Sequence, residues 1–194
     1  MSFFYLKNNY YWPFSTSSET KAFLGANFGM SPPEVNRALH MKLVGYEEYS
    51  RVVSKPLITD FLSSSTDLID VNLKKHFKSL FVPRIDLFDA SCEAEFDFLD
   101  KKLRGVYVHF QPYSQGDVNK LLNALNELLT RKYKFSNREE SKDVPGAYRM
   151  YYENEFVKVD LWINLTNLKE NIVVLTLLYK PYLVALRSPL KFDQ

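Results

Sequence analysis

The sequence predicts an α+β protein in which an antiparallel sheet of about six strands is packed by two to three helices. Some segments alternate apolar and polar side chains, as strands with one buried face do, whereas others repeat apolar residues at helical spacing. The expected order of elements is ααβββαβββ. It lacks the regular strand–helix alternation from which parallel sheets are built.

The same order suggests how the chain is divided. We expect an aromatic arm and linker over residues 1–20, a single α+β domain over residues 21–180 and a C-terminal extension over residues 181–194. Each half of the domain reads as helix followed by a three-stranded meander. Two similar halves, at about 21–112 and 113–180, are therefore an alternative, although no repeat is found at the level of residues.

The hairpin from Cys92 to Phe110 is the clearest strand pair, with a polar turn at residues 100–102. Its apolar positions on the two strands are Cys92, Ala94, Phe96, Phe98, Val106, Val108 and Phe110. The alternating positions are polar: Glu93, Glu95, Asp97, Tyr107 and His109. We therefore expect one face of the hairpin to lie on a core and the other to be wet or to meet a partner.

The elements before this hairpin are expected to be mostly helical. A turn of helix is expected over residues 21–27, and Ser31-Pro32-Pro33-Glu34 then has the pattern of a capped helix start. Apolar residues at helical spacing predict a second helix over residues 67–80. A first strand is expected over residues 83–90.

After the hairpin, Ser114 and Asp117 begin the most regular helix of the chain, which reaches Tyr133. Its apolar stripe consists of Val118, Leu121, Leu122, Leu125, Leu128, Leu129 and Tyr133. A charged loop is expected over residues 137–146. Three strands follow, over residues 147–153, 156–165 and 172–179, and the last is apolar on both faces, which predicts a central strand.

Composition excludes several classes of function. With 46% hydrophobic residues, 25% charged residues and a net charge of +2, the chain resembles a globular protein without a nucleic-acid or anionic-membrane partner. The single cysteine, Cys92, excludes an internal disulfide and a multi-cysteine zinc site, and we expect it to be a buried hydrophobe. We do not expect the N-terminus as written to be a signal peptide, nor any stretch to span a membrane. The location stays unknown at this point: cytoplasmic for the chain as written, periplasmic if a leader was removed.

Two stretches resemble bacterial envelope proteins. Phe28-Gly29-Met30-Ser31-Pro32-Pro33-Glu34-Val35 is similar to the opening of proteins of the β-lactamase-inhibitor-protein-like class and of the small lipoprotein of the outer-membrane assembly machine. The phrase from Phe96 to Val106 resembles a hairpin of the same proteins, although Lys101 stands where a turn glycine is often found. The resemblance implies an envelope location and a scaffold or inhibitor role.

No pattern identifies a catalyst, a cofactor site or a metal site. The three histidines do not form a helical ligand pair, and neither a nucleophile elbow nor a phosphate-binding glycine loop is present. The strongest acid–base candidate is His109 with Glu95, which share the polar face of the hairpin. The competing interpretation is a solvated face with cross-strand charge pairs to Lys102 and Arg104.

The leading hypothesis is a non-enzymatic protein–protein interaction module of the scaffold, inhibitor or assembly-factor type. Aromatic residues make up 15% of the chain, and several of them stand at positions that periodicity leaves partly outside the core. The candidate partner-binding residues are Tyr10, Tyr11, Trp12, Phe14, Tyr107 and Trp162. The alternative is a small-molecule-binding protein or hydrolase with a pocket between helices and sheet. For the aromatic arm, the interpretation favoured over partner binding is packing over the protein's own sheet or helices, and lipid contact is a further alternative.

Overall fold

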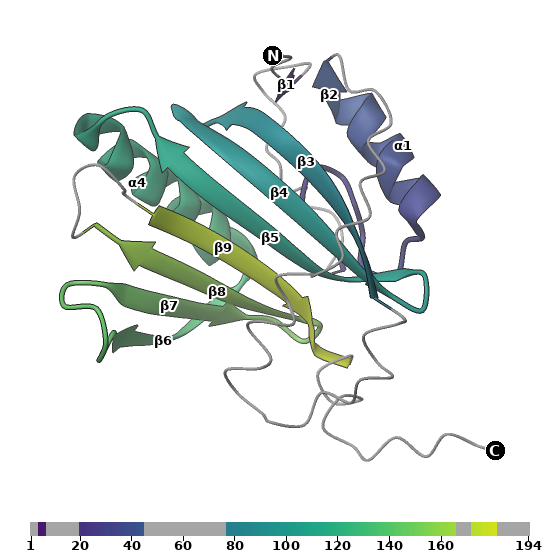
Figure 1. Cartoon of the computed structure of the whole chain (residues 1–194). Coiled ribbons are helices and arrows are strands. Elements are labelled where there is room, and N and C mark those ends of the chain that lie inside the picture. Colours follow the sequence, from purple (N-terminus) through teal and green to yellow (C-terminus); the bar gives the residue numbers. More distant parts are fainter. Residues whose placement is uncertain (1–3, 7–19, 45–76, 166–171, 182–194) are drawn as a thin grey trace.

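The computed structural model describes residues 4–6, 20–44, 77–165 and 172–181 (Figure 1). The helices are α1 (Pro32–Lys42) and α4 (Gln115–Lys132). The strands are β1 (Phe4–Leu6), β2 (Leu43–Val44), β3 (Phe77–Leu87), β4 (Ala90–Leu99), β5 (Lys102–Pro112), β6 (Lys134–Glu140), β7 (Tyr148–Glu153), β8 (Val157–Asn164) and β9 (Ile172–Tyr179).

All these strands form one sheet in the order β2-β1-β3-β4-β5-β9-β8-β7-β6. In this order, each strand of the series β3-β4-β5-β9-β8-β7-β6 pairs antiparallel with its neighbours, which gives seven antiparallel strands. The short strand β1 pairs with β3 in parallel. The α+β class with an antiparallel sheet is thus confirmed, with seven main strands in place of about six. The central position expected of residues 172–179 is also confirmed, because β9 lies between β5 and β8.

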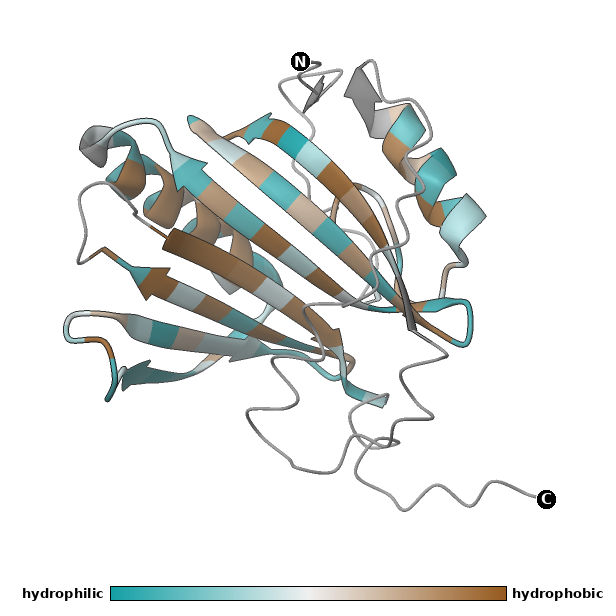
Figure 2. Cartoon of the chain, viewed as in Figure 1, coloured by the Kyte–Doolittle hydropathy of each residue, from teal (hydrophilic) through white to brown (hydrophobic). Residues whose placement is uncertain are grey.

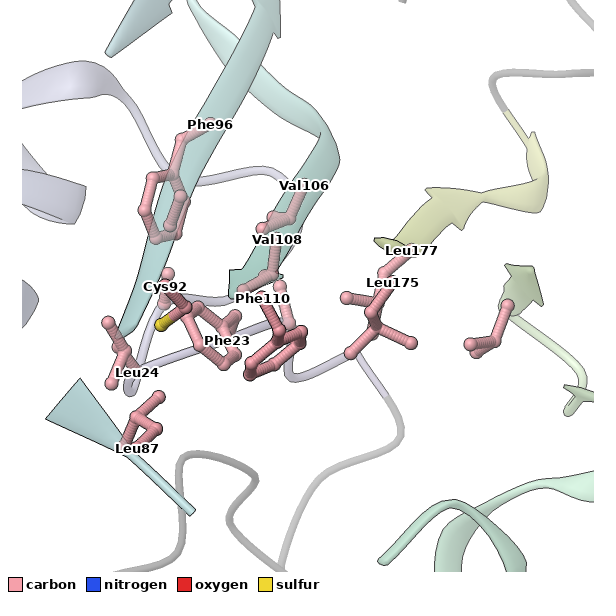
Figure 3. Packing of buried hydrophobic residues seen from close by; sticks show 14 of the residues in the cluster. Phe23, Leu24, Leu87, Cys92, Phe96, Val106, Val108, Phe110, Leu175 and Leu177 are labelled. Atoms are coloured by element: carbon pink, nitrogen blue, oxygen red, sulfur yellow. The ribbon is translucent and has the colours of Figure 1, made fainter. Parts of the chain in front are cut away.

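The core lies on one face of this sheet. Apolar side chains from β3, β4, β5, β9, β8 and β7 form a single buried cluster with residues of α1 and α4. Figure 3 shows the part of this cluster that lies on β3, β4, β5 and β9. The alternating bands along β4 and β5 in Figure 2 show why only one face joins the core. In register, Cys92 opposes Phe110 and Ala94 opposes Val108, so the predicted apolar face of the hairpin is confirmed.

Both confirmed helices begin at the caps that the sequence indicates. The carboxylate of Glu34 accepts hydrogen bonds of 2.7 Å from the backbone N–H and from the hydroxyl of Ser31. The bond from the backbone N–H is the one by which the glutamate of a capping box reaches back to the first residue of the cap. Ser114 caps α4 and accepts from the Asp117 N–H at 3.3 Å. The stripe of α4 is buried on the core side from Val118 to Tyr133, with Leu122 partly exposed.

Three predicted elements are wrong where the structure describes them. Residues 77–80 open strand β3 instead of ending a helix, and residues 67–76 lie outside the described residues. Strand β6 continues to Glu140, where a loop from residue 137 was expected. Residues 21–27 form a tight turn closed by a bridge between Lys21 and Asn27, with positive φ at Leu24 and Gly25, and contain no helix.

The aromatic arm is described only in part. Its residues Phe4–Leu6 form β1, in register with Ile85 and Asp86 of β3. The candidate binding residues Tyr10, Tyr11, Trp12 and Phe14 lie outside the described residues, as do residues 182–194 of the expected C-terminal extension. Neither described helix has the length and apolar character required to cross a membrane.

Candidate binding surface

The sheet face opposite the core, here called the second face, carries most of the polar side chains of the central strands. Pairing register places Glu95, Tyr107, Thr176, Asp160 and Tyr151 side by side across β4, β5, β9, β8 and β7. A neighbouring row runs through Glu93, His109, Val174, Trp162, Arg149 and Glu139. Residues far apart in the sequence thus share one surface.

One part of this surface, the covered end, consists of Ser79, Glu95, Asp97 and Tyr107 on β3, β4 and β5. All four residues are buried, with Asp97 at 0% and Tyr107 at 6% exposure. The Ser79 hydroxyl donates to the Asp97 carboxylate at 2.5 Å. The expectation that this face of the hairpin would be wet is therefore wrong for Glu95, Asp97 and Tyr107, although Glu93 is exposed and His109 is half-buried.

The other part, the open end, consists of Arg149, Tyr151, Lys158, Asp160 and Trp162 on β7 and β8, with Glu139 on β6. The Arg149 guanidinium donates to Asp160 at 3.0 Å and lies 4.9 Å from the centre of the Trp162 ring. Trp162 is half-buried, and the Arg149 side chain is 38% exposed. The ion pair and the stacking hold a tryptophan and an arginine in place at the surface.

An open hollow of about 480 Å³ adjoins this end of the sheet. Its lining combines Arg149, Tyr151 and Trp162 with the end of β6 and the β6–β7 loop: Glu139, Glu140, Ser141, Lys142, Asp143 and Val144. The loop is held by backbone hydrogen bonds from Ser141 to Ala147 and from Ala147 to Val144, at 2.8 and 3.1 Å. These bonds fix the backbone of the loop on one side of the hollow.

The electrostatics of the open end centre on Asp160. Burial raises the pKa of this carboxyl, while the Arg149 charge acts in the opposite direction. Oxygen Oδ1 of Asp160 is buried without a hydrogen-bond partner within the described part of the chain, whereas Oδ2 accepts from Arg149. Burial and the charge of Asp160 also raise the pKa of Tyr151, whose hydroxyl donates to Glu139 at 3.1 Å.

His109 and Glu95, the candidate acid–base pair, lie farther apart than the sequence alone suggests. His109 directly opposes Glu93, and Glu95 directly opposes Tyr107, so His109 and Glu95 are diagonal neighbours. Diagonal positions on a sheet lie about 7–8 Å apart. Glu95 is buried, and neither residue lines the hollow described above. Acid–base work by this pair stays a prediction.

Other candidate chemistry is limited in the described residues. Cys92 is buried, as predicted, and burial raises the pKa of its thiol, which disfavours the reactive thiolate. Among the residues with described positions, no three His, Cys, Asp or Glu side chains gather as metal ligands would.

The predicted partner-binding residues are thus divided by the fold. Trp162 lines the hollow, Tyr107 lies in the covered end, and the four residues of the arm lie outside the described part. Sequence reasoning missed Arg149, Glu139 and Asp143. Period-two alternation could place Arg149 and Tyr151 on one face of β7, but only the register with β8 brings Arg149 to Trp162.

Comparison with models of protein families, with curated proteins and with solved structures gives no match for this chain. The resemblance to bacterial envelope proteins stays a prediction.

Proposed function

We propose that the chain is a non-enzymatic protein–protein interaction module that binds its partner through the open end of the second face. The single observation that carries this proposal is the hollow bounded by Trp162, Tyr151 and Arg149. Tryptophan, tyrosine and arginine are the residue types that contribute most binding energy at protein interfaces. A half-buried tryptophan beside a concave surface provides the kind of site at which a partner side chain can be enclosed.

The ordering of these side chains supports the same proposal. Binding costs free energy when flexible side chains must be immobilised, about 0.5–1.5 kcal/mol for each. Arg149 is already held by Asp160 and by the Trp162 ring, and Tyr151 by Glu139. A partner would therefore meet a surface whose larger side chains are fixed before contact.

The experiment compares three forms of the full chain. Tagged wild type, Trp162→Ala and a control, Asn123→Ala on the exposed side of α4, are incubated with an extract of the organism that encodes the protein. We expect a defined protein to be retained by wild type and by Asn123→Ala, and to be reduced at least about tenfold by Trp162→Ala. Urea unfolding of each variant checks that its fold is intact.

The proposal fails if the three forms retain the same proteins in the same amounts. The size of the hollow also suits a small molecule, since ligand pockets occupy about 300–1,000 Å³. This observation favours the alternative of a small-molecule-binding protein. A compound that raises the melting temperature of wild type, and raises that of Trp162→Ala much less, would support the alternative instead.

A further inference from the structure

We infer that Lys132, the last residue of α4, is a nucleophilic lysine that accepts an acyl group from a thioester. The inference rests on where the fold holds this side chain: half-buried, against the backbone of the tight turn of residues 21–27, and beside a second lysine, Lys21. It goes beyond the proposed function, because neither lysine lines the hollow.

The tight turn gives Lys132 a defined position. A backbone bridge joins Lys21 to Asn27, and the chain after the turn is tied to β5, because the Gly29 N–H donates to the Leu103 carbonyl at 2.9 Å. The Nζ of Lys132 donates to the Lys21 carbonyl, also at 2.9 Å. A neutral amine can donate this hydrogen bond as well as an ammonium group can, so the contact does not require the charged form.

The charges around Lys132 differ from those around an ordinary surface lysine. Among the residues that the structure describes, no carboxylate lies within ion-pair distance of Lys132. Lys120, on the same helix, lies 3.0 Å from Asp117 and 3.4 Å from Asp89. The charged neighbour of Lys132 is Lys21 instead, which repels an ammonium group.

This environment makes the uncharged amine of Lys132 accessible near neutral pH. Burial, and to a smaller extent the charge of Lys21, lower the pKa of Lys132 to about 8. The Tyr133 ring, whose centre is 5.4 Å from Nζ, and the C-terminal end of α4 favour the charged form and limit the shift. Hydrogen bonds and charges of Asp117 and Asp89 raise the pKa of Lys120.

The chemistry follows from the uncharged amine. A lysine that is desolvated beside another cation is activated as a nucleophile. The lone pair of Nζ attacks the carbonyl carbon of the thioester, a C–N bond forms and the C–S bond breaks. The leaving thiolate takes up the proton that the nitrogen loses, so the products are an amide and a free thiol.

The site favours an acyl group over other electrophiles. An acylated Nζ is uncharged, so the burial and the repulsion that act on the ammonium group no longer act on it. It also keeps one N–H, which can still donate to the Lys21 carbonyl. An imine formed with an aldehyde has no N–H in its neutral form. A carbamate formed with carbon dioxide would place an anion near the negative face of the Tyr133 ring.

Acetylation of the full chain tests the inference, with acetyl-coenzyme A as the thioester and mass spectrometry of fragments as the readout for each lysine. At about pH 7.5 the neutral amine makes up about one quarter of Lys132 and roughly a thousandth of an ordinary lysine. The lower basicity of Lys132 offsets part of this gain. We therefore expect Lys132 to react at least about tenfold faster than Lys120.

The pH profile and the unfolded chain give two further readouts. The rate at Lys132 should level off above about pH 8, whereas the rate at Lys120 should still rise at about pH 9.5. In urea the two lysines should react at equal rates, because the unfolded chain has lost both environments.

Two variants locate the cause. Lys21→Gln removes the neighbouring charge and keeps the backbone carbonyl, so the levelling of the Lys132 rate should move to higher pH and acetylation at about pH 7.5 should slow. Lys21→Arg keeps the charge and should leave both properties unchanged. Circular dichroism checks that each variant keeps its fold.

Four results would overturn the inference: equal rates at Lys132 and Lys120 in the folded chain, a Lys132 rate that still rises at about pH 9.5, a preference for Lys132 that persists in urea, or equal effects of Lys21→Gln and Lys21→Arg.

Discussion

The covered end and the open end of the second face are built from the same strand pattern, yet the fold uses them differently. At the covered end, Asp97 and Tyr107 are buried, and Ser79 donates to Asp97. At the open end, Arg149 and Trp162 are half-exposed beside a hollow. Polar alternation along a strand therefore predicts which side chains share a face, but not how exposed each of them is.

The largest expected difference between the two ends is in the effect of removing a tyrosine. Tyr107→Ala should lower the free energy of unfolding by about 3 kcal/mol, because it removes a buried aromatic ring from a packed site. Tyr151→Ala, at the open end, should cost about 1 kcal/mol or less. Urea unfolding of both variants measures the two values. Equal losses in the free energy of unfolding for Tyr107→Ala and Tyr151→Ala would show that the two ends do not differ in packing.

A smaller effect is expected from the ion pair of the open end. Arg149→Met should lower the free energy of unfolding by about 1 kcal/mol, because Asp160 is buried and loses its charged partner, while the exposure of Arg149 limits the cost. In a chain that already carries Asp160→Asn, Arg149→Met should lower the free energy of unfolding by much less. A double-mutant cycle measures the coupling. Additive effects would show that the pair does not order this end.

The pH dependence of stability should reflect Asp160. Burial raises the pKa of this carboxyl above its ordinary value of 3.8, so the folded chain holds the proton more tightly than the unfolded chain. The contribution of Asp160 to the free energy of unfolding is then fully present below pH 3.8 and is lost as the pH rises through the folded-state pKa. Relative to wild type, Asp160→Asn should gain stability as the pH rises from about 3 to about 7.

Urea titrations at several pH values measure this difference. A matched variant at an exposed carboxylate, Glu155→Gln, controls for the general effect of removing one negative charge. A constant difference between Asp160→Asn and wild type across the pH range would contradict the burial of Asp160 as the cause.

The smallest expected effect on the free energy of unfolding concerns the turn between β4 and β5. Asp100 and Lys101 between β4 and β5 both have positive φ, a conformation that suits glycine, whereas the β6–β7 loop of the open end has Gly146 at its positive φ. Lys101→Gly should raise the free energy of unfolding by about 0.5 kcal/mol. Urea unfolding again measures the change. A loss of stability would show that the Lys101 side chain contributes more than its backbone strain costs.

Much of the fold was predictable from local patterns, and the failures have physical reasons. The hairpin of β4 and β5 and the helix α4 follow from alternation and from the cap at Ser114, which are local properties. Strand β6 was missed because each of its residues is exposed, so no apolar alternation marks it. The start of β3 was missed because Phe77 and Leu80 also fit helical spacing.

The binding surface was predictable only in part. Trp162 was recognised because aromatic residues outside the core are typical of interfaces. Its relation to Arg149 depends on the pairing register of β7 with β8, and the hollow depends on the loop that follows β6. A single sequence fixes neither the register nor the loop, since both result from contacts between distant residues.

The central claim is that the partner binds at the open end and not at the covered end. A photoreactive phenylalanine derivative, placed at Lys142 beside the hollow or at the exposed Glu93 next to the covered end, tests this claim in living cells. We expect a covalent adduct with a partner protein from position 142, no adduct from position 93, and loss of the adduct at 142 when Trp162→Ala is added. Adducts from position 93 alone, or equal adducts from both positions, would contradict the claim.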